Sequence, residues 1–295
     1  MFLIDLQTFI QLLVSGLLFG GIYTLVSVGL TLTLGVMNIV NLAHGDFLMI
    51  SLYAIYWMFE LYNIHPYISL LVVIILMFVL GLLVERFIIR PTIDKPRHVH
   101  IFATLGLSLI LQNLALMFWT GNFRTIRIPI AQLTWEVGGV FLNFSRILIF
   151  AVALFAALLI YLFLKYTWIG RAIRATSQDR NAAMLMGINI DKVFMITFAI
   201  GISTLGLAAG LLLPLYFVYP TVGFQFTLVA VVIIVMGGLG SIKGAIIASI
   251  FIGIVETLSG YFIDPAMKQA IYFIIFICVL IFKPSGLFGK KLKVA

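Results

Sequence analysis

Charged residues are scarce in this chain. Only 9% of its 295 residues are Asp, Glu, Lys or Arg, whereas soluble domains carry roughly 25%. Another 63% are hydrophobic, so the few charges present could not cover a water-facing surface on a protein of this size. These proportions exclude soluble, disordered and fibrous classes and indicate an integral membrane protein.

Cysteine and the usual catalytic motifs are also missing. Cys278 is the only cysteine, so no disulfide can form within the chain. The sequence has no G-x-x-x-x-G-K-[ST] phosphate loop, no H-E-x-x-H zinc motif and no G-x-S-x-G nucleophile motif. His44 and Asp46 could suggest an intramembrane protease, but two residues apart they would not share a helix face. We therefore expect no enzyme, no metal site and no cofactor bound by this chain.

Apolar runs of about 20 residues, the length that a helix needs to cross a bilayer, are abundant. They predict an all-α transmembrane bundle with about eight or nine crossings, forming a single domain over 1–295. The first run is too long for a signal-peptide core, so we expect it to be retained as a membrane helix. The expected spans are roughly 9–30, 44–60, 66–87, 100–120, 146–165, 193–213, 222–240, 244–262 and 267–283.

Positive charge is concentrated in a few stretches. The net charge of +8 indicates Lys- and Arg-rich cytoplasmic loops in a membrane protein, rather than a nucleic-acid site. Most Lys and Arg residues fall within 86–97, 165–192 and 283–293. An even number of expected crossings separates these stretches, so all can be cytoplasmic, with the loop at 121–145 external. The N-terminus is then external unless residues 31–43 form a crossing of their own.

A polar segment interrupts the apolar pattern after the first span. Residues 31–43 could form half a crossing, a re-entrant turn or the end of a long tilted helix, and we expect a broken or re-entrant segment near 31–46. Polar groups at membrane depth are costly unless protein or water satisfies them. The segment therefore either lines a substrate path or forms an ordinary turn at the membrane edge. Its candidate path or gate residues are Asn38, Asn41, His44, Gly45 and Asp46.

Glu256 falls within an apolar span. A carboxylate there should face the interior of the bundle or a cavity. It could belong to the substrate path, and it is a candidate path residue for that reason. It could equally be a structural group that pairs with Lys243 or accepts a hydrogen bond from Thr257 or a nearby serine, and this alternative is favoured.

Glycines indicate a second break and several helix contacts. The stretch 236–244 interrupts an apolar region, and Gly-interrupted segments are typical of a transporter's binding region. A broken helix or a tight turn is expected there, formed by Gly237, Gly238, Gly240 and Gly244. Glycines four residues apart allow close helix packing in lipid. Such pairs are Gly16 with Gly20, Gly206 with Gly210, and Gly240 with Gly244.

The cytoplasmic stretch 166–192 predicts a short surface helix over 177–187. Ser177 can cap its first turn, Asp179 suits that turn electrostatically, and Gly187 can end it. A helix this short is marginal alone, so something should cover its small and apolar face. The cover could be a groove in a partner protein, the lipid surface or the chain's own bundle. The residues on or beside that face are Asp179, Ala182, Ala183 and Met186.

Three stretches of the sequence resemble one known family. They read GRAIRATSQDRNAA…GIN at 170–189, GGIYTL…NIVNLAHGDF at 20–47, and GGLGSIKGA at 237–245. Together they are similar to the LivH-type high-affinity branched-chain amino-acid permeases, which are membrane subunits of binding-protein-dependent ABC importers. Asn181-Ala-Ala followed by Gly187 resembles the Glu-Ala-Ala…Gly loop of ABC importer permeases, with Asn181 where a Glu would stand.

This resemblance implies a permease of the bacterial inner membrane. Its expected substrates are leucine, isoleucine and valine; urea or short amides are the alternative, and a gradient-driven secondary transporter is the rival class. The implied partners are two cytoplasmic ATPase subunits that hold ATP and Mg, an extracytoplasmic binding protein, and a second permease, either LivM-like or another copy of this chain. The residues expected to couple to the ATPases are Arg171, Arg174, Asp179, Ala182, Ala183 and Gly187.

Overall fold

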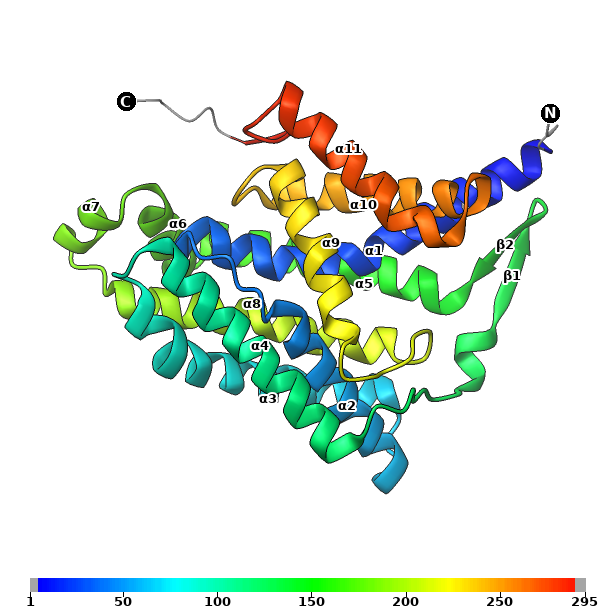
Figure 1. Ribbon diagram of the computed structural model, residues 1–295, viewed down its shortest axis with the longest axis horizontal. Coiled ribbons are helices and arrows are strands. Elements are labelled where there is room, and N and C mark those ends of the chain that lie inside the picture. The colour runs from blue at the N-terminus through cyan, green and yellow to red at the C-terminus, as the bar shows by residue number, and fades with distance from the viewer. Residues whose placement is uncertain (1–4, 290–295) are drawn as a thin grey trace.

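The computed structural model describes residues 5–289, and that part of the chain is mostly helical (Figure 1). Its helices are α1 (Leu6–Met37), α2 (His44–Tyr62), α3 (Pro66–Val84), α4 (Arg97–Trp119), α5 (Phe144–Tyr166), α6 (Trp168–Gln178), α7 (Arg180–Leu185), α8 (Ile190–Leu212), α9 (Val222–Gly237), α10 (Ile242–Phe262) and α11 (Lys268–Phe282). Short π and 3-10 turns lie at Glu85–Ile89, Arg90–Thr92, Pro129–Gln132 and Pro265–Met267. One antiparallel hairpin pairs β1 (Thr134–Val137) with β2 (Val140–Asn143).

Each expected span contains a helix, which confirms the helical membrane bundle. Within residues 5–289, 7 helical spans are long and apolar enough to cross a membrane. They include α1, α4, α5, α8 and α10, together with the stretches built on α3 and α11. The other two expected spans hold α2, with 19 residues, and α9, with 16.

Helix α1 is longer than a bilayer crossing requires. Its 32 residues extend about 48 Å at the rise of an α-helix, against a hydrocarbon core of about 30 Å. Residues 31–43 were expected to form half a crossing, a re-entrant turn or the end of a long helix. For residues 31–37, the end of a long helix is correct. The helix ends at Asn38, whose left-handed backbone (φ 55°) turns the chain out of the helical path. Residues 38–43 then lead to α2 without helical structure.

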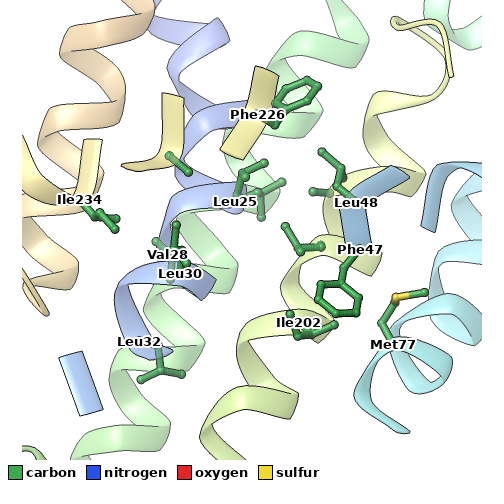
Figure 2. Packing of buried hydrophobic residues seen from close by; sticks show 14 of the residues in the cluster. Leu25, Val28, Leu30, Leu32, Phe47, Leu48, Met77, Ile202, Phe226 and Ile234 are labelled. Atoms are coloured by element: carbon green, nitrogen blue, oxygen red, sulfur yellow. The ribbon is translucent and has the colours of Figure 1, made fainter. Parts of the chain in front are cut away.

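Helices α1 and α8 are the most buried of the spans, whereas α4 and α11 are the least buried. Figure 1 shows α11 along one edge of the bundle. Figure 2 shows the packing of buried apolar residues, with Leu25 from α1, Phe47 from α2, Ile202 from α8 and Phe226 from α9. Hydrophobic burial gives little drive between helices in lipid, so the fit of these side chains matters more than their apolar area.

Glycines set the closest helix approaches. A Cβ on Gly16 would lie 2.7 Å from the Ile254 Cα of α10, and one on Gly20 would lie 2.6 Å from the Ile250 Cα. Gly206 of α8 meets the backbone of α3 in the same way. The expected role of these glycines in close helix packing is therefore confirmed.

The two ends of the bundle differ in charge and structure. The hairpin and the start of α1 lie at one end, where the Gln7 and Gln11 side chains donate to the carbonyls of Gly139 and Phe141; α6 and α7 lie at the other end (Figure 1). The α6–α7 end carries the basic stretches 86–97 and 165–192. With those stretches cytoplasmic, the hairpin end is external. Lys290, Lys291 and Lys293 of the third basic stretch lie outside the described residues.

Candidate functional site

The polar break between α1 and α2 passes through the interior of the bundle. Asn38 is exposed, but Asn41 is buried, and its Oδ1 accepts a hydrogen bond from the Ala43 amide at 3.1 Å. The Asn41 Nδ2 has no hydrogen-bond partner within residues 5–289. A buried amide group without a partner is unusual in a folded protein, so this segment holds unused hydrogen-bonding capacity.

His44 and Asp46 occupy the first turn of α2 and are both buried. The His44 Nε2 lies 2.9 Å from the carbonyl oxygen of Val26 in α1. The Asp46 Oδ1 accepts a hydrogen bond from the Gln112 Nε2 of α4 at 2.9 Å. Within residues 5–289, neither the His44 Nδ1 nor the Asp46 Oδ2 has a hydrogen-bond partner. The two side chains thus bind different helices, and each keeps one free polar atom.

Gly45 brings the first turns of α2 and α9 together. A Cβ on Gly45 would lie 2.6 Å from both the carbonyl carbon of Gly223 and the Thr227 Oγ1. The Gly45 amide donates to the Thr227 Oγ1 at 2.8 Å. Sequence reasoning missed Gly223 and Thr227; a glycine and a threonine four residues apart at the start of a short apolar helix were the available signal.

Two cavities lie along the break and α9. One, of about 260 Å³, is lined by Asn38, Arg97 and His100 along with apolar residues. The other, of about 160 Å³, is mostly apolar, with Ser108 and Thr227 as its polar lining groups. Of the candidate path residues in the break, Asn38 lines one of these two cavities, and Asn41, His44, Gly45 and Asp46 line neither.

Glu256 belongs to a different part of the bundle. Its Oε2 accepts a hydrogen bond from the Tyr23 hydroxyl of α1. None of the expected partners contacts the carboxylate. Lys243 lies 13 residues away near the opposite end of α10, and the Thr257 hydroxyl donates to the Gly253 carbonyl at 2.9 Å. The nearby serine, Ser259, does bind Glu256, but its hydroxyl donates to the backbone carbonyl at 3.1 Å. A tyrosine more than 200 positions away could not be found from local spacing.

The glycine-rich stretch 236–244 is a tight turn between α9 and α10. Gly237 ends α9, Gly244 lies in the first turn of α10, and Gly238 and Gly240 have φ angles of 103° and 76°. Only glycine takes such φ values without strain. A Cβ on Gly35 of α1 would lie 2.6 Å from the Gly240 Cα. The expected break is confirmed, and it lies against the cytoplasmic end of α1.

The cytoplasmic segment contains two helices where one was expected. Ser177 lies in the last turn of α6, so its assignment as the N-cap of the second helix is wrong. Asp179 is the N-cap of α7, and its Oδ1 accepts from the amides of Asn181 at 2.9 Å and Ala182 at 3.0 Å. The ending at Gly187 is confirmed: its φ is 80°, and the Ile188 amide donates to the Ala183 carbonyl at 3.1 Å.

The outward face of α7 is not the expected one. Ala183 is only 4% exposed and faces the chain's own bundle, so it cannot share an outer face with Met186. The exposed residues are instead Met184, Leu185 and Met186, at 58%, 86% and 82%. Arg171, Arg174 and Ala182 are exposed as well. The apolar tip formed by Met184, Leu185 and Met186 was missed, because the burial of a six-residue helix depends on distant contacts.

A family model described as "Branched-chain amino acid transport system / permease component" matches residues 12–280. The chain belongs to this family. LivH of Escherichia coli K12, a high-affinity branched-chain amino acid transport system permease protein, is 31% identical over 96% of each chain. The corresponding BraD protein of Pseudomonas aeruginosa is 29% identical over 97% of each. A probable LivM permease of Methanocaldococcus jannaschii is 27% identical, covering 84% of this chain and 77% of its own length.

A comparison with solved structures gives no match. Family membership makes the chain a non-enzymatic, multi-pass membrane subunit of a transport system. Within residues 5–289 there is no group of three or more His, Cys, Asp or Glu residues that could hold a metal ion.

Two surface ion pairs join segments at the cytoplasmic end of the permease. The Arg180 Nη1 of α7 lies 3.1 Å from the Asp94 Oδ1, and its guanidinium is 5.4 Å from the centre of the Phe194 ring. The Arg90 Nη2 lies 2.9 Å from the Asp191 Oδ2 at the start of α8. Arg180 thus joins α7 to the turn after α3 and to α8.

Proposed function

We propose that this chain is a path-forming permease subunit of an ATP-driven importer for branched-chain amino acids in the bacterial inner membrane. The carrying observation is the similarity to LivH and BraD over nearly the whole length of each chain. The weaker similarity to a LivM permease supports a pairing of two related permeases. A second copy of this chain is the alternative partner, and an extracytoplasmic protein delivers the substrate.

The apolar tip of α7 is the proposed contact with the ATPases. Methionine and leucine side chains exposed to cytoplasmic water are stabilised by burial in a groove on a partner protein. Asp179 and Gly187 fix the two ends of this helix, and Arg171 and Arg174 flank it as further contacts. The two ATPase subunits hold ATP and Mg, and their closure moves α7.

The break at 38–46 is the proposed gate. Asn41, His44 and Asp46 each have one polar atom without a partner within residues 5–289. These atoms can take new hydrogen bonds in a second conformation, whereas a fully bonded segment would have to break bonds first. The contact between Gly45 and Gly223 joins α2 to α9, and a non-helical segment precedes each of these helices. ATP can bias such an element only by binding the two conformations with different affinity.

The contact with the ATPases is tested by Leu185→Glu. Leu185 is 86% exposed, so the variant should insert and fold normally, while a charge in an apolar groove lowers ATPase capture and leucine uptake by roughly tenfold or more. Gln178→Glu is the matched control, because it adds the same charge at an exposed cytoplasmic position outside the apolar tip. Normal uptake and normal ATPase capture by Leu185→Glu would overturn the assignment.

A further inference from the structure

A polar cavity of about 80 Å³ lies around Glu256, away from the break at 38–46. Its wall includes Tyr23 from α1, Tyr216 from the segment between α8 and α9, and Tyr272 from α11. Glu256 itself is only partly buried. Its Oε2 is occupied by the Tyr23 hydroxyl, while its Oε1 receives no hydrogen bond within residues 5–289. One carboxylate oxygen is thus available to a ligand in a cavity bounded by tyrosines.

Aromatic rings make up much of this wall. The Phe19 and Tyr23 ring centres are 5.2 Å apart, and those of Tyr216 and Phe226 are 5.8 Å apart. Phe19 and Tyr216 join the two pairs, at 6.3 Å. Aromatic faces attract ammonium groups through the ring quadrupole, most strongly where water is excluded. Rings combined with a carboxylate favour a positively charged ligand group.

A second cavity, of about 290 Å³, shares Phe19 and Glu256 with the first. Arg146, at the start of α5, and Lys268, at the start of α11, also line it. Lys268 extends over Gly260, where a Cβ would lie 3.4 Å from its Cδ. Neither cation takes part in an ion pair within the described part of the chain. Groups of both charges therefore line one side of the bundle, with Phe19 between the cavities.

The charged groups of these cavities lie toward the external ends of their helices. Glu256 is six residues from the end of α10, or about 9 Å along the helix. Arg146 and Lys268 lie in the first turns of helices that run toward the basic, cytoplasmic end. A ligand arriving from outside would therefore meet Arg146 and Lys268 first.

We propose that the two cavities form a binding site for the head group of an α-amino acid, which rests on the amino-acid import proposed above. Glu256 and the surrounding tyrosine rings hold the ammonium group, and Arg146 and Lys268 hold the carboxylate. Phe19 supplies apolar surface beside the head group. The charge pattern matches a zwitterion, whereas a neutral amide or urea would leave both the acidic and the basic groups without a counterion.

The test uses the purified complex of permeases and ATPases without the binding protein. Radiolabelled leucine binding is measured, with isoamylamine as a competitor that has only the ammonium group and 4-methylpentanoate as one that has only the carboxylate. Glu256→Gln should weaken binding of both leucine and isoamylamine by roughly tenfold or more. Arg146→Gln should weaken leucine binding and leave the inhibition constant of isoamylamine unchanged. Glu136→Gln, at an exposed position in β1, is the matched control and should bind as the wild type does.

A binding role predicts that each variant weakens only the competitor that carries the matching group: isoamylamine for Glu256→Gln and 4-methylpentanoate for Arg146→Gln. If Glu256 only supported the fold, its variant would lower thermal stability and weaken both competitors alike, and Arg146→Gln would not discriminate between them; that result overturns the proposal. Leucine binding by Glu256→Gln at wild-type affinity overturns it as well. If the complete wild-type system imports leucine but the complex shows no Glu256-dependent binding, this inference fails while the importer function stands. If the complete wild-type system imports no leucine, the proposed function itself fails.

Discussion

The junction of α2 and α9 should not tolerate a side chain at Gly45. In a Gly45→Ala variant, the new Cβ would lie 2.6 Å from the Gly223 carbonyl carbon and from the Thr227 Oγ1, closer than real contacts allow. The Gly223 neighbour is backbone, so a helix must shift to relieve the clash. The same shift would stretch the 2.8 Å hydrogen bond from the Gly45 amide to the Thr227 hydroxyl.

The size of the effect follows from these contacts. Overpacking a well-packed site costs about 1–3 kcal/mol, and weakening a buried hydrogen bond adds about 1 kcal/mol. The better helix propensity of alanine returns up to about 1 kcal/mol. We therefore expect Gly45→Ala to lower the free energy of unfolding by about 1–3 kcal/mol.

Reversible unfolding by SDS titration in mixed micelles, followed by tryptophan fluorescence, measures this difference. Gly106→Ala in α4 is the matched control, because a Cβ there would meet nothing within 4 Å. The control should be neutral or stabilised by up to about 1 kcal/mol. Equal unfolding midpoints for Gly45→Ala and Gly106→Ala would refute the close contact between α2 and α9.

Three further substitutions test the hydrogen bonds and ion pairs of the site. Asp179→Ala removes the acceptor for two α7 amides and should destabilise that helix by about 1 kcal/mol; hydrogen exchange of α7 should speed up, and Asp179→Asn should largely restore protection. Asp46→Ala removes one of the two acceptors of the Gln112 Nε2, the other being the Ser108 hydroxyl, and should cost about 1 kcal/mol in the SDS titration, while a smaller loss is expected for Asp46→Asn, which keeps an oxygen. Arg180→Gln should change the unfolding free energy by less than about 1 kcal/mol, because the side chains of Arg180 and Asp94 are 44% and 81% exposed; a larger loss would mean that the pair is more than a surface contact.

The positions of the helices could be predicted from the sequence because a membrane span leaves a local signal about 20 residues long. Breaks were visible for the same reason: Asn38 and the glycines of 236–244 interrupt apolar runs, and Asn38, Gly238 and Gly240 take backbone angles that most residues avoid. The helix ending at Gly187 likewise depends on a single residue. Each of these features is encoded within a few neighbouring positions.

Features set by distant contacts were missed or assigned wrongly. Ser177 and Asp179 are both good N-cap residues, and only the fold of α6 decides between them. Ala183 was placed on an outer face, but packing buries it. The partner of Glu256 is Tyr23 on another helix, and the contact of Gly45 with Thr227 joins segments 182 positions apart. Spacing within one helix carries no information about such pairs.

ATP-dependent leucine uptake into proteoliposomes tests the importer function most directly. The complete system contains this chain, its partner permease, the ATPases and the binding protein, with ATP enclosed on the cytoplasmic side. Leucine should accumulate in vesicles that hold ATP and not in vesicles that hold a non-hydrolysable analogue, and a protonophore should leave uptake unchanged. Leucine uptake by this chain alone, abolished by the protonophore and indifferent to ATP, would instead identify a gradient-driven transporter and contradict the importer function.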